Sequence, residues 1–202
     1  MGKQELKNRA EWQDMSGMKA AIAEHNLYNA LGDYFSGTCY ELIRHPKHLK
    51  NLYANIALSQ TTLRQIFCPN IDYDSVKWGI SPDFAIRNSK TGKMIFGEIK
   101  RQDGWVEGKA PSAGRGNAHE RLCKYFTPGL LDACRRIGGI ADESVLPFWV
   151  VFEGDITQDP KRVREITFWF GNFQGNFFMW RPNHTEKELI QHFRKYIRPS
   201  LA

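Results

Sequence analysis

The stretch SPDFAIRNSKTGKMIFGEIK, residues 81–100, is the segment of the sequence from which the fold is most directly predicted. Two runs rich in Phe and Ile flank a polar turn at residues 89–92, a pattern that is typical of a β-hairpin. With the turn centred between its two middle residues, Asp83 faces Glu98 across the hairpin. Lys100 lies two residues beyond Glu98 and therefore projects from the same face. The register thus predicts that two carboxylates and one amine converge.

The same register predicts what the other face of the hairpin does. It pairs Ala85 with Phe96 on the face that carries the acids. The residues on either side of these two along each strand therefore point to the opposite face. The side chains expected to anchor the hairpin in the core are Phe84, Ile86, Ile95 and Ile99.

Two carboxylates at this separation repel each other unless a cation lies between them. Hard oxygen ligands in such a pair suit Mg²⁺, which keeps several waters and also binds phosphate oxygens. The backbone carbonyl of Ile99 is a further candidate ligand. Lys100 would orient or deprotonate a metal-bound water, or stabilise negative charge that develops on a phosphate. The alternative interpretation is a surface hairpin in which Asp83, Glu98 and Lys100 form ordinary cross-strand ion pairs.

Length and composition fit one globular domain. The chain has 202 residues, of which 42% are hydrophobic and 25% charged, enough for one sizeable core. Its formal net charge of +6 suits a polyanionic partner. No apolar run approaches the roughly 18 residues that a membrane span needs, and the first residues do not resemble a signal peptide. The four scattered cysteines are expected to be reduced thiols in the cytoplasm.

Apolar spacing and the positions of Pro and Gly predict the other elements. Helices are expected over residues 1–35, 40–58 (interrupted at Pro46), 117–126, 129–137, 160–170 and 185–196. Irregular segments are expected at residues 63–74 and 101–116. Strands are expected at residues 75–86, 93–99, 145–153 and 176–180, the third of them buried on both faces.

This order of elements predicts an α/β fold in which α-helices flank a mixed central β-sheet. We expect a single domain over residues 1–202. It would contain a helical N-terminal region at residues 1–74, a core with the predicted site at 75–155, and a C-terminal region with helices and a short strand at 156–202.

A second motif, GRGNAHER, occupies residues 114–121, directly after the expected loop. Asn117 is a favourable helix N-cap, and Glu120 three residues later completes a pattern like a capping box. Capping does not account for Arg115 and Arg121, and a basic helix N-terminus is well placed to approach DNA. Asn pairs with adenine and Arg with guanine through two hydrogen bonds each, and Glu accepts from exposed amino groups of bases. The motif therefore indicates a segment that reads bases.

The two motifs together resemble a known family. Pro82-Asp83 followed by Glu98-Ile99-Lys100 resembles the active-site motif of the PD-(D/E)XK nuclease superfamily. By this resemblance, Asp83 and Glu98 are ligands of a catalytic metal ion and Lys100 is the catalytic lysine.

The segment from Gly116 to Arg121 is similar to the recognition segment of EcoRI-type restriction endonucleases. That similarity places Asn117, Ala118, Glu120 and Arg121 over an AATT core. The apolar run at residues 148–154 is similar to the buried strand of the same group, so the resemblance extends at least over residues 81–154. His119 stands at the variable position of the motif and is assigned no role.

The resemblance implies a Type II restriction endonuclease with the restriction endonuclease-like fold. Such an enzyme belongs to a restriction-modification system and acts in the bacterial cytoplasm as a homodimer, with Mg²⁺ as its cofactor. It cuts both strands of double-stranded DNA at a palindromic hexanucleotide with an AATT core. The expected site is C/AATTG, which leaves four-base 5′ overhangs.

Two other classes of function stay open at this point. One is a nuclease of the same superfamily that recognises DNA structure, as repair and junction-resolving enzymes do. The other is a DNA-binding protein in which the hairpin acids are only structural. Incubating a mixed-sequence plasmid with Mg²⁺ separates the three functions. A restriction enzyme gives discrete fragments, and a nuclease that recognises DNA structure gives smearing or cuts junctions. A DNA-binding protein binds without cutting.

Arg115 has no equivalent arginine in the shared Gly-Asn-Ala-x-Glu-Arg core, and we hypothesise that it reads the guanine of the outer base pair. Replacing Arg115 with Ala should then weaken binding to the cognate duplex by roughly 1–3 kcal/mol. Gel-shift titrations of cognate and outer-pair-substituted duplexes measure this. An equal loss on every sequence would instead identify Arg115 as a phosphate contact.

Overall fold

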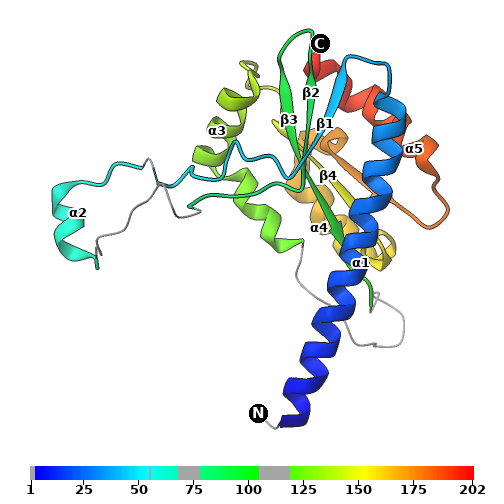
Figure 1. The fold of residues 1–202 in the computed structure, drawn as a ribbon, viewed down its shortest axis with the longest axis horizontal. Helices are drawn as coiled ribbons and strands as arrows, with labels where there is room; N and C mark the ends of the chain where they lie inside the picture. Colours follow the sequence, from blue (N-terminus) through cyan, green and yellow to red (C-terminus); the bar gives the residue numbers. More distant parts are fainter. Residues whose placement is uncertain (1–2, 55, 68–77, 105–118) are drawn as a thin grey trace.

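The protein is described from a computed structural model, in which residues 3–54, 56–67, 78–104 and 119–202 are placed. A five-stranded sheet stands at the centre, and helices cover both of its faces (Figure 1). In order across the sheet, the strands are β1 (Tyr40–Arg44), β2 (Phe84–Asn88), β3 (Met94–Arg101), β4 (Phe148–Glu153) and β5 (Phe177–Trp180). β1, β2 and β3 are antiparallel neighbours, whereas β3, β4 and β5 run parallel. The predicted α/β fold with a mixed sheet is confirmed.

The α-helices of the described residues are α1 (Lys3–Phe35), α2 (Gln60–Gln65), α3 (Pro128–Gly138), α4 (Pro160–Phe170) and α5 (Glu186–His192). Short 3₁₀ helices are η1 (Glu120–Phe126), η2 (Asp155–Gln158), η3 (Gly171–Asn176) and η5 (Arg198–Leu201), and the π-helical turn η4 (Phe193–Ile197) continues α5. No helix among the placed residues combines the length and the apolar character needed to cross a membrane.

Each face of the sheet has its own core, because successive side chains of a strand point to opposite faces. On one face, α1, α5 and η4 pack against the four hairpin side chains predicted to be buried: Phe84, Ile86, Ile95 and Ile99. On the other face, η1, α3 and α4 pack over Ala85, Met94 and Phe96. β3 and β4 are therefore covered on both sides, as expected for the strands at the centre of such a sheet.

The hairpin register is as predicted. Ala85 pairs with Phe96, and the last pair of the ladder is Phe84 with Gly97. Asp83 and Glu98 therefore lie just beyond the end of the ladder, opposite each other. The turn at the other end includes Gly92, whose φ of +75° lies in the left-handed region that glycine adopts without strain.

The expected helix over residues 40–58 is wrong, and the N-terminal region (residues 1–74) is not all helical. Tyr40–Arg44 form the edge strand β1, which pairs with β2, and the residues that follow, up to Ala54, form turns. The free edge of β2 offers backbone hydrogen bonds that a helix at this position would leave unused. Pairing with β2, which lies later in the sequence, thus determines the structure of residues 40–44, although their apolar spacing favours a helix.

Smaller differences concern where elements begin and end. Some of the expected irregular segment 63–74 belongs to α2, which Ser59 caps by accepting the N–H of Thr62 at 3.1 Å. Of the strand expected over residues 75–86, residues 75–77 lie outside the described residues, and β2 begins at Phe84. The helix expected over 117–126 is the 3₁₀ helix η1, and residues 117 and 118 lie outside the described residues.

The elements after residue 127 follow the prediction closely. α3 ends before Gly139, which has φ +66° as a C-cap, and α4 spans the predicted residues 160–170. The buried strand is β4, and the short aromatic strand is β5. Thr185 and Glu188 form a capping box at the start of α5.

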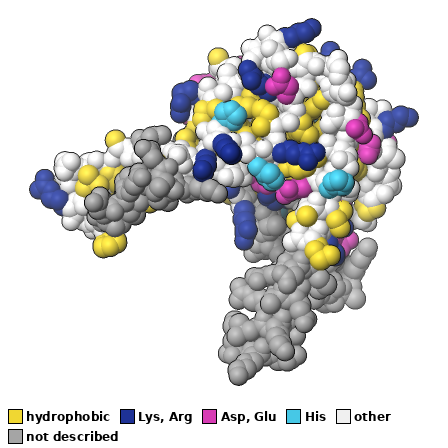
Figure 2. Space-filling view, viewed as in Figure 1, with side chains coloured by type: hydrophobic (Ala, Val, Ile, Leu, Met, Phe, Trp, Pro, Cys, Tyr) yellow, Lys and Arg dark blue, Asp and Glu magenta, His cyan; other side chains and the backbone are white. Residues whose placement is uncertain are grey.

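The segment that carries α2 projects from the body of the molecule (Figure 1). Hydrophobic side chains are exposed on this projecting segment (Figure 2). Among residues 56–67, the large hydrophobic side chains that are exposed are Ile56, Leu58, Ile66 and Phe67.

Gly97 leaves room for a ring that supports the hairpin. A Cβ atom at this position would lie 2.1 Å from Cζ of the buried Phe84. We expect Gly97→Ala to lower the free energy of unfolding by about 1–3 kcal/mol, because the ring must leave its packed position. Urea unfolding measures the loss.

The matched control is Gly32→Ala in α1, where an added Cβ meets no atom within 4 Å. Ala favours a helix over Gly, so this control should gain about 0.5–1 kcal/mol. Similar effects of both substitutions would contradict the packing role of Gly97.

Candidate active site

The structure brings together the three charged side chains that the register predicts to converge. Lys100 Nζ lies 3.3 Å from Asp83 Oδ2 and also donates a hydrogen bond to Glu98 Oε2. The exposed fractions of the side chains are 18% for Lys100, 19% for Asp83 and 6% for Glu98. These charges are largely shielded from water, so the hairpin does not lie on the surface as the alternative interpretation expects, but the ion pairs of that interpretation are formed.

Asp83 is positioned by three neighbouring elements. It directly precedes β2, and its Oδ2 accepts the backbone N–H of Ile99 in β3 at 2.8 Å. Its backbone carbonyl accepts from the hydroxyl of Tyr28 in α1 at 2.8 Å and from the N–H of His45 at 2.9 Å. The two ends of the residue are thus held independently, which orients the carboxylate toward β3.

Burial and neighbouring charges oppose each other at Glu98. Burial raises the pKa of Glu98 above its ordinary value, and the Asp83 carboxylate adds to this, while Lys100 acts in the opposite direction. Burial by itself would lower the pKa of Lys100, but Glu98 and Asp83 together raise it. The ammonium group therefore stays charged and compensates the two carboxylates in the metal-free protein.

Tyr125 is a member of the site that sequence reasoning missed. This η1 residue is 1% exposed, and its hydroxyl donates a hydrogen bond to Glu98 Oε1. Burial, followed by the Glu98 charge, raises the pKa of Tyr125 far above its ordinary value, so the hydroxyl keeps its proton. No sequence pattern links two residues so far apart, because the contact arises from the packing of η1 on the sheet.

Glu24 of α1 is a second residue near the site that the sequence did not indicate, and unlike Tyr125 it carries a carboxyl group. Burial and then the Asp83 charge raise the pKa of Glu24, and His45 and Lys100 act against them. Glu24 Oε2 lies 3.8 Å from His45 Nε2. A helical period of apolar residues in α1 predicts which side faces the core, but not that this carboxylate lies near the hairpin.

Only some of the residues predicted to read DNA are placed. Glu120 and Arg121 are exposed in the first turn of η1, on the side away from the core. Arg115, Gly116, Asn117 and Ala118 lie outside the described residues. Their roles, and those of Glu120 and Arg121, stay predictions.

His119, to which the sequence assigned no role, is fully buried. Its ring stacks on Trp169 of α4 at a centroid distance of 5.5 Å, and its Nε2 lies 3.3 Å from Glu165 Oε2. Burial lowers the pKa of His119, and the charge of Arg162 lowers it further. His119 therefore fastens the start of η1 to α4.

The donor set fits a divalent metal ion that keeps some of its water shell. Among the described residues, no group of three or more His, Cys, Asp and Glu side chains could hold a metal. Asp83 and Glu98 supply two carboxylates, and Mg²⁺ typically binds through one or two of these and completes its shell with water and phosphate oxygens. Lys100 at present supplies the positive charge that such an ion would bring. The Ile99 carbonyl as a ligand stays a prediction.

Basic, acidic and His side chains meet in the middle of one face of the molecule (Figure 2).

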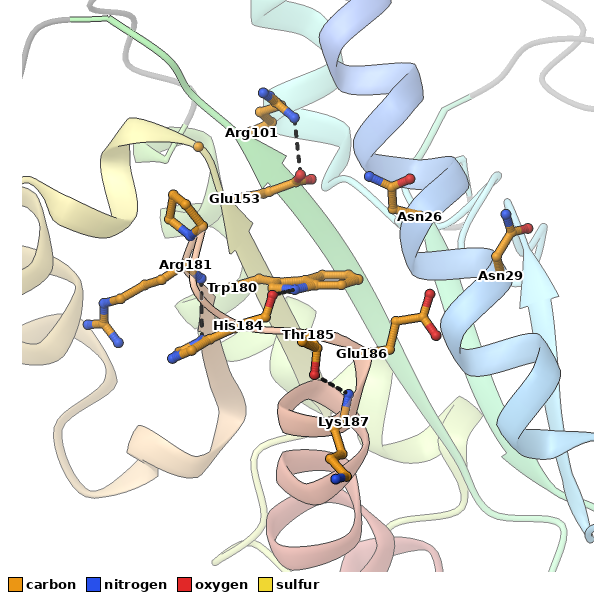
Figure 3. Close-up of a pocket in the computed structure, with 12 residues that line it drawn as sticks. Asn26, Asn29, Arg101, Glu153, Trp180, Arg181, His184, Thr185, Glu186 and Lys187 are labelled. Atoms are coloured by element: carbon orange, nitrogen blue, oxygen red, sulfur yellow. Dashed lines mark hydrogen bonds and ion pairs between the residues drawn. The ribbon is translucent and has the colours of Figure 1, made fainter.

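A separate pocket of about 830 Å³ opens where β3, β4 and β5 end, beside α1 (Figure 3). Arg101 lines it and pairs with Glu153 at 3.0 Å. Because Arg101 follows Lys100 on the strand, the two side chains point to opposite faces of the sheet. The pocket is therefore distinct from the carboxylate pair, and its lining carries charges of both signs.

Comparison with known proteins decides which family has this arrangement. The family model described as Type II restriction enzyme MunI matches residues 1–202. The Type II restriction enzyme MunI of a Mycoplasma species is 62% identical over 201 residues, which is 100% of this chain and 100% of that protein. The chain belongs to the MunI family of Type II restriction enzymes.

The fold agrees with this assignment to the MunI family. The crystal structure of MunI restriction endonuclease in complex with cognate DNA matches with a TM-score of 0.81 and 62% identity. The match covers 95% of this chain and 97% of that one. The restriction endonuclease-like fold, the nuclease activity and the resemblance to the EcoRI-like group are thereby confirmed. Type II restriction enzymes depend on a divalent metal, in keeping with the carboxylate pair.

Removing the ammonium group of Lys100 should leave the buried carboxylate pair of the MunI-type site without compensation. We expect Lys100→Met to lower the free energy of unfolding of the metal-free protein by about 3–5 kcal/mol at alkaline pH. Without Lys100 the pKa of folded Glu98 rises further above its unfolded value. The folded state then binds more protons than the unfolded state, so the loss shrinks as the pH falls toward mildly acidic values.

Urea unfolding at both pH values, with a chelator present, measures this change. The control is Lys90→Met in the exposed hairpin turn, which should stay within about 0.5 kcal/mol of the parent at either pH. A pH-independent loss in Lys100→Met would contradict the proposed compensation.

Proposed function

We propose that this Type II restriction enzyme cleaves double-stranded DNA at C/AATTG and leaves four-base 5′ overhangs. The observation that carries the proposal is the convergence of Asp83, Glu98 and Lys100 in a chain 62% identical to MunI over its full length. MunI recognises C/AATTG. The GRGNAHER motif of this chain, with its predicted preference for an AATT core, supports the same site.

Asp83 and Glu98 are the residues that would hold the metal, which we propose to be Mg²⁺, with the Ile99 carbonyl as a third protein ligand. When bound, the ion lowers the pKa of a coordinated water and offsets charge on the phosphate. Lys100, held in its charged form, stabilises the negative charge that develops on the attacked phosphate. Its position on β3, two residues beyond Glu98, keeps the ammonium group near both carboxylates, and its flexible stem lets it turn to the phosphate when the metal takes its place between them.

The DNA-reading role falls to the segment that leads into η1. Arg115, Gly116, Asn117, Ala118, Glu120 and Arg121 are the proposed DNA contacts. The exposed position of Glu120 and Arg121 leaves both side chains free to reach base edges. A side chain that reads a base edge supplies specificity, whereas contacts to phosphates only position the duplex.

A palindromic site requires a two-fold symmetric reader, so we propose that the enzyme acts as a homodimer. Each protomer would contribute one carboxylate pair and cut one strand. The proposed place of action is the bacterial cytoplasm, where foreign DNA enters. The domain organisation fits this scheme, because the cleaving residues and the proposed reading segment lie in the same central region, residues 75–155.

Sequencing the ends of plasmid fragments produced with Mg²⁺ tests the proposal, because it gives the site, the cut position and the overhang together. We expect every end to begin with a four-base 5′ AATT overhang flanked by the outer C·G pair. Fragments with mixed ends, or cutting only at branched junctions, would favour a structure-directed nuclease of the superfamily.

Asp83→Ala tests the roles of the carboxylates in the same assay. We expect it to abolish cleavage and to retain specific binding, which tightens without metal because one negative charge facing the phosphates is gone. Asp132→Ala, an exposed substitution on α3, is the matched control and should cut like the parent. Substantial Mg²⁺-dependent cutting by Asp83→Ala would refute the metal-ligand role.

A further inference from the structure

We propose that Tyr125 is a positioning residue for Glu98, and that its hydroxyl holds the carboxylate in the orientation in which it binds a divalent metal. The inference rests on the proposed role of Glu98 as a metal ligand. Tyr125 would thus be an additional residue of the cleaving site. It belongs to η1, the helix that begins with the last residues of the proposed DNA-reading motif.

The two oxygen atoms of Glu98 have different partners. Oε1 accepts from the Tyr125 hydroxyl, whereas Oε2 accepts from Lys100 on the side of Asp83. A carboxylate held at both oxygens cannot rotate about its terminal bond. Each oxygen keeps further lone pairs, so the contact with Tyr125 orients Glu98 without using up its capacity to bind a metal.

Tyr125 is itself held rigidly. Its ring packs against Phe148 of β4 at a centroid distance of 5.1 Å and is almost completely buried. Side chains three residues apart lie on one face of a 3₁₀ helix. His119, Leu122 and Tyr125 follow this spacing, and all three are buried. The hydroxyl is therefore placed by an entire helical face and not by a single flexible side chain.

The other face of the same short helix begins with Glu120 and Arg121, two of the proposed DNA contacts. At one end His119 joins this unit to α4 through Trp169 and Glu165. At the other end Tyr125 joins it to Glu98 in β3. One seven-residue helix thus connects the proposed reading residues with a proposed metal ligand.

A buried tyrosine hydroxyl normally finds a hydrogen-bond partner, so the contact by itself is also consistent with a role in stability alone. The two roles differ in what the hydroxyl changes. A purely stabilising hydroxyl affects unfolding, whereas a positioning hydroxyl affects metal affinity and the cleavage step at saturating DNA. Groups that orient metal ligands typically change metal affinity or activity by about 10–100-fold when they are removed.

The test is Tyr125→Phe, which keeps the ring and removes only the hydroxyl. Mn²⁺ binding to the full-length protein is measured by titration, and single-turnover cleavage is measured with saturating cognate duplex. We expect Mn²⁺ affinity and the cleavage rate to fall by about 10–100-fold, while duplex affinity without metal stays within twofold of the parent. Tyr40→Phe removes a hydroxyl from the edge strand β1, packed on the opposite face of the sheet, and should change none of these values.

A double variant makes the result independent of stability. In a Glu98→Gln background, Tyr125→Phe should leave the remaining Mn²⁺ affinity unchanged, because the hydroxyl acts only through the carboxylate. Equal losses in both backgrounds, or parental Mn²⁺ affinity and cleavage in Tyr125→Phe alone, would overturn the proposal. Full Mn²⁺ affinity in Glu98→Gln would instead refute the metal-ligand role of Glu98, which separates this failure from that of Tyr125.

Discussion

The structure depends on a central strand that is packed on both faces and hydrogen-bonded on both edges. β3 pairs antiparallel with β2 and parallel with β4, and a separate core covers each of its faces. A strand constrained in this way cannot shift by one residue without turning its apolar side chains toward the wrong core. Glu98 and Lys100 lie near the end of this strand, so their common face is fixed by the same packing. The charged site is therefore held in place by apolar contacts.

Charge compensation at the site follows from this placement. Two carboxylates and one ammonium group are enclosed where water screens them poorly, and each depends on the others. Removing one charge from such a group lowers the free energy of unfolding by more than the intact group contributes to it, because the remaining charges stay buried without a partner. The same imbalance is what would give the proposed divalent cation its affinity, since the pair of acids carries more negative charge than one lysine offsets.

Sequence reasoning succeeded where a local rule governs the contact. The hairpin turn sets the register of Asp83 and Glu98, and Gly and Pro mark the ends of the later helices. It failed at Tyr40–Arg44, which forms a strand only because β2, about 40 residues later, provides a free edge. Tyr125 and Glu24 were missed for the same reason: their places beside the hairpin come from the packing of η1 and α1. The proposed DNA contacts rest on a motif and on similarity, because four of the six lie outside the described residues.

The 3₁₀ period of η1 has a consequence for how the proposed DNA-reading residues can be exchanged. The buried positions recur at every third residue, so Glu120, Arg121, Cys123 and Lys124 face outward and Leu122 and Tyr125 face inward. Outward residues can be exchanged without repacking the core, whereas a single inserted residue would rotate the helix and withdraw Tyr125 from Glu98. Libraries aimed at new target sites should therefore vary side chains in this helix at constant length.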